Sequence, residues 1–541
     1  MRPNERILSI LVRHGYWLVL NHLMTTRTRQ IVRLTLLLLA GCANSSSRAP
    51  TPLPESAAPP PPRAALLPTP PAPEREFRGL WVASFQNLDW PSRPGLPASQ
   101  QKAELTAILD RAVQLHLNAI LLQVRPGCDA LYDSKLEPWS AFLSGKMGVA
   151  PQPYYDPLAF AVTQCHNRGL ELHAWFNPFR VRLLNDKTPA AKNYVANTRP
   201  ELVRAAGEVL MLDPADPRSR GYSLGVIMDV VRRYDIDGVH LDDYFYPYPS
   251  KGYKPSDFPD DALWQRYEKA GGKLSRGDWR RENINIFVRL VNDSIKKEKP
   301  WVKFGISPFG IWRPGHPAEV TAALDSYEAL FADSQAWLAN GWLDYLSPQL
   351  YWPSDDKEHS FSALLQWWSA QNTRGRHLWP GMQTGEWPGF KGDPAAETAM
   401  EIELTRRQPG AAGEVLWRAN FVMRNPGGIG AALAGSYSAP ALVPASPWLG
   451  RQAPGKPLLT VHGTGREISV AWKPAGGEPV WQWLLQEQFG GNWRAEILPA
   501  AQTSRFLSAG GGAALPRSVA VTAVTRVGIL SPPAVSSLEP R

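Results

Sequence analysis

Apolar runs alternate with amphipathic segments over most of the chain. Eight runs have the length and composition of strands, at 79–85, 118–125, 170–177, 238–243, 303–309, 345–351, 377–383 and 414–419. Segments between them, such as 101–117 and 219–236, place apolar residues at helical spacing. Eight strand–helix repeats predict an α/β fold, a closed (β/α)8 TIM barrel over residues 75–435. An open doubly wound sheet is the alternative, but the chain has no GxGxxG turn or P-loop to support it.

The pattern changes after residue 435. Residues 436–455 are rich in proline and small residues and are expected to form a linker. Within 456–541, apolar and polar residues alternate at period two in four runs, at 468–474, 480–489, 492–498 and 518–528. This alternation predicts a small all-β sandwich. The final run, AVTAVTRVGILSPP, resembles the last strand of fibronectin type III modules, so we expect a fibronectin type III-like domain.

The first 42 residues have the pattern of a signal peptide, with Met24 as the expected true start. Three arginines precede a short apolar run at 34–40, and the sequence LAGC ending at Cys42 resembles a bacterial lipobox. The apolar run is too short to span a bilayer. We therefore expect lipidation of Cys42 and anchoring to a bacterial membrane in the cell envelope, on its periplasmic face. Residues 43–74, rich in Pro, Ala and Ser, are expected to form an extended tether.

Composition excludes several classes of protein. The net charge of +9 arises from 58 basic and 49 acidic residues that are interspersed, without the basic runs of a nucleic-acid module. The three cysteines and the histidines show no metal-ligand spacing, so neither a metal nor another cofactor is expected. The chain has no GxSxG elbow between a strand and a helix, which argues against a serine hydrolase. The 22 tryptophans suit either sugar stacking or large cores.

The strand-like run at 238–243 carries the most informative polar residues. Alternation along a strand sends Val239 and Leu241 toward the helices, and His240 and Asp242 toward the barrel interior. Asp242 and Asp243 then lie at the carboxyl end, where catalytic groups of such barrels gather. Neighbouring carboxyls in a buried site can differ in pKa, as glycoside hydrolysis requires. We therefore expect at least one of the two to be catalytic.

Other polar side chains are expected at the same end. The expected substrate-binding residues are Arg125, Asp129, His173, Asn177, His240, Tyr244, Gln349, Tyr351 and Trp352. Gln123 is expected beside Arg125, and Arg125 is expected to pair with a carboxylate there. Glu386, after the seventh run, and Asp129, after the second, are both candidates for a second acid. The separation of the two carboxyls would decide between retention and inversion of the anomeric centre, and a sequence holds no such distance.

Six segments together resemble the glycosyl hydrolase-like 10 family of bacterial envelope proteins. They are RGLWVASFQNLDWPS, QVRPGCDALYDSKLEPWS, YYDPLAFAVTQCHNRGLELHAWFNPFR, DIDGVHLDDYFYPYP, VKFGISPFGIWR and WLDYLSPQLYW, within residues 75–352. The resemblance implies a barrel that hydrolyses glycosidic bonds of a polysaccharide, with peptidoglycan glycan strands as the suspected substrate. The fourth run also resembles the nucleophile strand of α-amylase-type barrels, which implies Asp242 as nucleophile. It departs from the chitinase pattern, since Tyr244 stands where that pattern has its catalytic Glu.

Three hypotheses follow. In the first, an envelope glycosidase uses Asp242 as nucleophile or stabiliser and Asp243 or Glu386 as proton donor. In the second, a catalytically inactive glycan-binding or scaffold lipoprotein uses the same residues to accept hydrogen bonds from sugar hydroxyls. In the third, the same machinery hydrolyses another polysaccharide, such as an α-glucan.

Overall fold

A ten-stranded parallel sheet is the centre of the first part of the protein. The computed structural model describes residues 67–321, 323–385, 390–463, 467–509 and 514–538. The sheet has the order β10-β12-β13-β1-β2-β3-β7-β8-β9-β11. Its strands are β1 (Phe77–Val82), β2 (Ala119–Arg125), β3 (Glu171–Phe176), β7 (Gly238–Leu241), β8 (Lys303–Ile306), β9 (Tyr345–Leu346), β10 (Gln349–Leu350), β11 (His377–Leu378), β12 (Gly381–Gln383) and β13 (Gly413–Trp417).

These strands lie within or overlap the eight predicted runs. The sixth run holds two short strands, β9 and β10, which are separated at Pro348. The seventh holds β11 and β12, separated at Pro380. Proline has no amide hydrogen to donate to a neighbouring strand, so it interrupts the ladder at both places. The predicted α/β class is confirmed, with a parallel sheet that curls.

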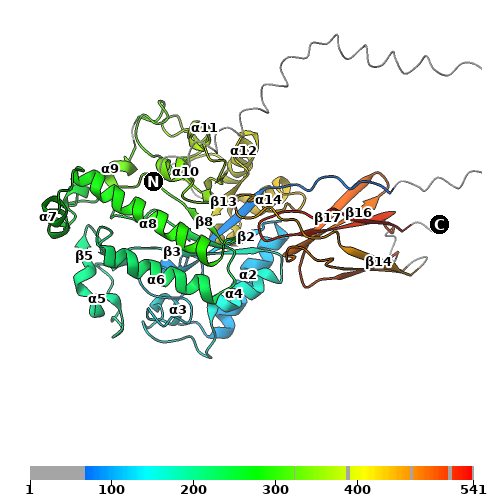
Figure 1. Ribbon diagram of the computed structural model, residues 1–541, viewed down its shortest axis with the longest axis horizontal. Coiled ribbons are helices and arrows are strands. Elements are labelled where there is room, and N and C mark those ends of the chain that lie inside the picture. The colour runs from blue at the N-terminus through cyan, green and yellow to red at the C-terminus, as the bar shows by residue number, and fades with distance from the viewer. Residues whose placement is uncertain (1–66, 322, 386–389, 464–466, 510–513, 539–541) are drawn as a thin grey trace, which may run out of the picture. The chain divides into compact units, whose positions relative to one another are not determined.

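Helices follow the strands and cover the sheet, and α6 and α8 lie side by side on it (Figure 1). The longer helices are α2 (Ala98–Gln114), α4 (Pro157–His166), α6 (Pro217–Arg233), α7 (Asp261–Lys269), α8 (Arg276–Glu298), α10 (Ser334–Asn340), α11 (Phe361–Gln371), α12 (Pro394–Arg407) and α14 (Ile429–Ser436). Shorter ones are α3 (Ala141–Ser144), α5 (Val195–Thr198), α9 (Ser326–Ala329) and α13 (Ala419–Arg424). Helices α4, α6 and α12 each begin at an Asp-Pro pair, in which the aspartate accepts from backbone amides of the first turn. Among the described residues, no helix is long and apolar enough to cross a membrane.

The two faces of the sheet contact different groups. Val239 and Leu241 of β7 pack in the large apolar core that includes the helices, as the alternation predicts. The opposite face contributes a smaller cluster with large rings, among them Trp81, Trp175 and Tyr345. Glycine makes room for these rings: a Cβ at Gly305 would lie 2.1 Å from the ring of Tyr345.

A chain of hydrogen bonds runs through this inner cluster. The indole of Trp81 can only donate, so Nε2 of His240 accepts at 3.2 Å and the proton of His240 lies on Nδ1. Nδ1 then donates to the hydroxyl of Tyr345 (3.1 Å), which donates to Nδ1 of His173 (2.8 Å). Nε2 of His173 donates to Glu171 (3.0 Å). Glu171 also accepts from Lys303, at 2.7 Å. With one proton on each imidazole, this chain has a single consistent set of donors and acceptors.

A second, three-stranded antiparallel sheet is inserted between β3 and α6. It has the order β4-β6-β5, with β4 (Arg180–Leu183), β5 (Val203–Ala206) and β6 (Val209–Leu212). The sequence did not predict it, because its strands are four residues long and do not alternate regularly in burial.

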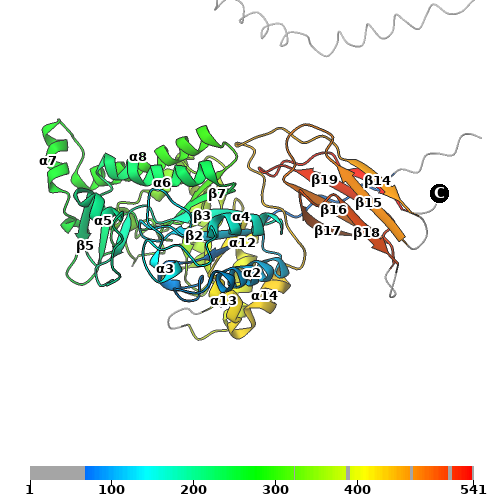
Figure 2. The same ribbon diagram turned by 90° about the horizontal axis from the view of Figure 1, so that it is seen from below.

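The C-terminal residues form two antiparallel sheets, of order β14-β15-β18 and β17-β16-β19-β20 (Figure 2). Their strands are β14 (Leu458–His462), β15 (Glu467–Lys473), β16 (Gln482–Phe489), β17 (Asn492–Pro499), β18 (Ser504–Ser508), β19 (Ser518–Val524) and β20 (Ala534–Ser537). The all-β prediction is confirmed for this region. Within 436–455, the region predicted to be a linker, Leu442 and Ser446 are buried, and Ser446 bonds His377 at 2.9 Å.

We predict that Tyr345→Phe destabilises the protein. The change removes the hydroxyl that joins His240 to His173, and each unpaired buried polar group costs about 1–3 kcal/mol. We expect urea unfolding to show a loss of about 2–4 kcal/mol. Tyr246→Phe is the matched control, because the buried Tyr246 hydroxyl has no hydrogen-bond partner among the described residues. Equal stabilities of the two variants would contradict the directed chain.

Candidate active site

Asp242 follows directly after β7, at the carboxyl end of the parallel sheet. Its Oδ2 accepts from Nε1 of Trp175 at 3.1 Å, and both carboxyl oxygens lie 3.1 Å from Nδ2 of Asn177. Both donors come from the end of β3, which pairs with β7 in parallel register. Asp242 is 3% exposed. Two neutral donors thus orient a buried carboxyl toward the end of the sheet where barrel enzymes carry out chemistry.

Burial dominates the ionisation of the two adjacent acids. It raises the pKa of Asp242 to about 7, against an opposing effect of the Arg180 guanidinium, and the charge of Asp243 raises it further. Burial also raises the pKa of Asp243, which accepts a hydrogen bond from the Tyr248 hydroxyl. With a pKa near neutrality, Asp242 keeps its carboxylate form accessible at neutral pH despite its burial.

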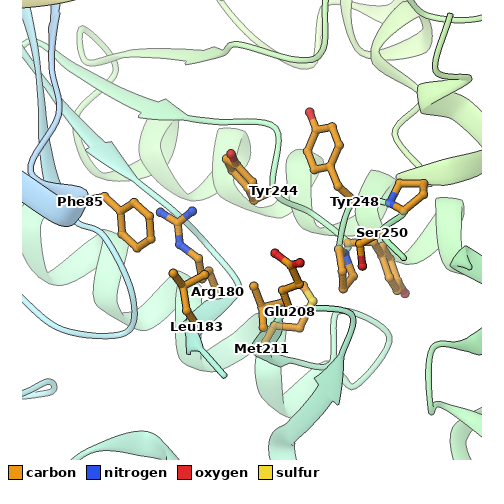
Figure 3. A pocket seen from close by; sticks show the side chains of 12 residues that line it. Phe85, Arg180, Leu183, Glu208, Met211, Tyr244, Tyr248 and Ser250 are labelled. Carbon is orange, nitrogen blue, oxygen red and sulfur yellow. The ribbon is translucent and has the colours of Figure 1, made fainter. Parts of the chain in front are cut away.

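Arg180 is the functional candidate that sequence reasoning missed. Its guanidinium lies 3.9 Å from the ring centre of Phe85 and 4.8 Å from that of Tyr244, and Figure 3 shows it between these rings. Its Nε donates to the carbonyl of Pro126 at 3.0 Å, and it forms no ion pair with a carboxylate within the described ranges. Its backbone amide donates to Oδ1 of Asn177 at 2.8 Å, and the side chain of Asn177 in turn donates to Asp242. The only signal in the sequence was its place three residues after Asn177.

A pocket of about 290 Å³ opens beside these residues. Its wall is made by the segment after Asp243, by the inserted sheet and by Phe85, which follows β1. The lining residues are Phe85, Arg180, Leu183, Glu208, Val209, Met211, Tyr244, Tyr246, Pro247, Tyr248, Pro249 and Ser250. Figure 3 shows the Glu208 carboxylate directed into it. Aromatic and apolar walls with a few charged groups suit a sugar, which has apolar C–H faces and polar hydroxyls.

Several predicted rim residues lie at this end of the sheet. Asn177 contacts Asp242, and Tyr244, 39% exposed, lines the pocket. Gln349 donates to the carbonyl of Ser307 at 2.9 Å, and a hydrogen bond from its side chain favours the ionised form of Asp243. Tyr351 stacks on Trp417, with ring centres 6.1 Å apart. Trp352 stacks on His359 at 5.0 Å and is partly exposed.

The chain was compared with known proteins. The family described as Glycosyl hydrolase-like 10 matches residues 76–389. The chain belongs to the glycosyl hydrolase-like 10 family. This finding confirms the resemblance predicted from the sequence.

Two relatives and two solved structures illustrate the likeness. Glycosyl hydrolase YngK of Bacillus subtilis (strain 168) is 39% identical over 398 residues, covering 72% of this chain and 77% of the relative. Glycosyl hydrolase DigH of Escherichia coli (strain K12) is 33% identical over 433 residues, covering 74% and 94%. Alpha-L-fucosidase isoenzyme 2 from Paenibacillus thiaminolyticus has a TM-score of 0.43 at 12% identity, covering 70% of this chain and 51% of that chain. The PgaB (BpsB) glycoside hydrolase domain from Bordetella bronchiseptica has a TM-score of 0.42 at 13% identity, covering 68% and 98%. The family and the named relatives support a glycosidase.

Arg125 does not line the pocket, contrary to expectation. Its guanidinium forms a buried ion pair with Glu137 at 2.6 Å and donates to the carbonyls of Asn177 and Pro178. It is 0% exposed, and its donors are occupied. Arg125 was expected to pair with a carboxylate of the strand ends, and in the structure it pairs with Glu137 instead. Arg125 supports the loop that carries Asn177 and has no donor left for a sugar.

His173 and His240, which were expected to bind sugar, are enclosed within the inner cluster. Both are 0% exposed, and their ring nitrogens are used in the chain that ends at Glu171. His173 pairs in register with Gly238, the first residue of β7, so it lies near the amino end of the sheet. Strand alternation gave the correct face of each strand but not the depth of the residue along it. Gln123 is occupied as well, since its side-chain oxygen accepts from the amides of Ser84 and Phe85.

The remaining candidates are distributed as follows. Asp129 is 3% exposed and lines a separate hollow, and burial raises its pKa to about 7. Glu386 and the lipidation candidate Cys42 lie outside the described residues. Within the described ranges, no cluster of three or more His, Cys, Asp or Glu side chains is placed to hold a metal ion.

We predict that Asp242→Asn stabilises the protein at neutral pH. Because burial raises the pKa of Asp242 to about 7, the folded state favours the protonated acid, and stability falls as pH rises from about 4 through 7. Asparagine cannot ionise, so its advantage over aspartate should grow by about 2–3 kcal/mol between pH 5 and pH 8 in urea unfolding. Asp261→Asn, at a side chain 71% exposed, is the control without such growth. Parallel stability curves for wild type and Asp242→Asn would contradict the burial argument.

Proposed function

We propose that this protein is a glycosidase of a cell-envelope polysaccharide and that Asp242 and Asp243 carry its chemistry. The observation that supports this most is the pair of buried carboxyls at the carboxyl end of the sheet, beside an aromatic-lined pocket. Hydrolysis of a glycosidic bond needs one group that protonates the leaving oxygen and one carboxylate that acts on the anomeric carbon or on water. Family membership supports the same reaction class.

The surroundings of the two acids favour different roles. Asp242 accepts from Trp175 and Asn177 and lies within the field of Arg180, and all three interactions favour its carboxylate form. We assign it as nucleophile or stabiliser. We assign Asp243 as the proton donor, with Glu386, which lies outside the described residues, as the alternative. In hydrolysis, the donor's proton goes to the leaving sugar oxygen, and water supplies the hydroxyl of the other product and restores the proton.

We infer further that the curled sheet is a (β/α)8 barrel. The first strand, β1, pairs with both β2 and the last strand, β13, and no open doubly wound sheet joins its ends in this way. If β9 with β10 and β11 with β12 are each one interrupted strand, eight strands close the ring. We also propose that the C-terminal sheets of three and four strands form a fibronectin type III-like sandwich, as their antiparallel pairings support.

The location and substrate are proposed on sequence grounds. The arginine-rich leader and the LAGC sequence ending at Cys42 support a lipid-anchored protein of the bacterial envelope. The Pro-rich residues 43–74 give such a protein reach into a polymer network. Peptidoglycan glycan strands are the proposed substrate because they are the polysaccharide nearest to that anchor.

We predict that the purified protein releases soluble fragments from peptidoglycan, tested both with its stem peptides and after their removal. Asp242→Asn should lower the rate at least a thousandfold, since a catalytic carboxylate cannot be replaced by an amide. Asp261→Asn makes the same chemical change on the surface and should keep the wild-type rate. If wild type and Asp242→Asn both release no fragments but sediment with the glycan, the protein binds glycan without cleaving it. Release of fragments from an α-glucan, and none from peptidoglycan, would show that the substrate is an α-glucan.

We predict that Arg180→Met shifts the pH dependence of hydrolysis upward. The positive charge of Arg180 lowers the pKa of Asp242, so its removal should raise the pKa and move the limb of kcat/KM that reflects ionisation of Asp242 to higher pH. Arg374→Met, at an exposed arginine, should leave this limb unchanged. A lower rate with an unmoved limb would show that Arg180 acts on the substrate and not through Asp242.

A further inference from the structure

We propose that a second hollow beside the active-site pocket binds another sugar of the same glycan chain. This inference rests on the proposed function and extends it to the length of glycan that the protein binds. The second hollow has a volume of about 180 Å³. Its wall consists of Phe85, Gln86, Gly127, Asp129, Phe142, Met147, Val181, Arg182, Leu183, Asn185, Asp186 and Tyr194.

The two hollows meet at a shared wall. Phe85 and Leu183 line both of them. Leu183 is the last residue of β4, and this strand contributes Arg180 to the first hollow and Arg182 to the second. Phe85 contacts Arg180 with its face and Phe142 of the second hollow at 5.5 Å in an edge-to-face arrangement. The inserted sheet thus joins the two hollows along one strand.

The floor of the second hollow is fixed by its own hydrogen bonds. The hydroxyl of Tyr194 lies 3.0 Å from the carbonyl of Gly127 and 2.6 Å from that of Val181. The Gly127 amide donates to Oδ1 of Asp129 at 3.1 Å. A Cβ at Gly127 would lie 2.6 Å from the Val181 carbonyl oxygen, so only glycine allows the two segments this close. A rigid floor binds a ligand without first ordering its own side chains.

The chemistry of this hollow fits a sugar ring. Phe142 and Met147 give it apolar surface, against which a C–H face can pack. Asp129 adds a buried carboxyl that can exchange hydrogen bonds with hydroxyls, and Asn185 adds an amide at the edge. The first hollow also carries Glu208 and Ser250. A chain that fills both hollows extends beyond the first hollow in the direction of β4.

The test measures how affinity depends on chain length. N-acetylglucosamine oligomers of two to six units are titrated into full-length Asp242→Asn by calorimetry, which separates binding from turnover. We expect affinity to rise about tenfold, equivalent to about 1.4 kcal/mol, once the oligomer is long enough to enter the second hollow. Adding Met147→Trp, which fills the hollow, or Phe142→Ala, which removes its wall, should abolish this rise. Leu184→Trp, at an exposed neighbour that does not line the hollow, should retain it.

Two other results would overturn the second hollow as a sugar site: equal affinities for all lengths, or a rise that persists in both hollow variants. Turnover of the same oligomers by wild type provides the second readout. The value of kcat/KM should rise at the length at which affinity rises, whereas a kcat/KM that does not depend on length would contradict a second sugar site. If wild type cleaves nothing, the proposed function fails, and the length dependence of binding still decides whether the second hollow holds a sugar.

Discussion

The candidate active site depends on how one carboxyl group is held at the end of β7. Strand alternation turns Val239 and Leu241 into the apolar core and leaves Asp242 on the inner face, where it is almost fully buried. A carboxyl so placed must either find donors or stay protonated. Trp175 and Asn177 supply two donors, and Arg180 supplies a nearby positive charge. Together with burial, these interactions set the pKa of Asp242 at about 7. The loop after β3 and the inserted sheet both serve this arrangement.

Buried charges elsewhere in the protein are paired differently. Arg125 is neutralised by Glu137, and Glu171 by Lys303, each at hydrogen-bond distance. Such pairs are complete, and removing one partner leaves an unpaired buried charge that costs several kcal/mol. Arg180 contacts no carboxylate among the described residues, and its guanidinium lies between two rings at the pocket wall. Arg180 therefore differs from these paired charges, and its guanidinium is available to a substrate.

Much of the fold could be predicted from the sequence, because strands buried on both faces are continuous apolar runs between amphipathic helices. The inserted sheet could not, since its short strands lack a period. For the site, alternation gave the position of Asp242 and its neighbour Asn177. Alternation did not give the depth of His173 in the sheet, because the face of a strand does not specify the position along it. It did not give the partner of Arg125 either, because Glu137 lies in a following loop with no distinguishing pattern. Arg180 was missed for a related reason: the segment after Asn177 is irregular, and only its fold brings the guanidinium to the pocket.

A crystal structure of Asp242→Asn with a bound glycan oligomer is the sharpest test of whether the chemistry takes place at Asp242. We expect a sugar in the pocket between Arg180 and Tyr244, with an anomeric carbon within about 3–3.5 Å of the residue-242 side chain. An oligomer that binds elsewhere, or that lies in this pocket with its glycosidic bonds out of reach of residues 242 and 243, would contradict it.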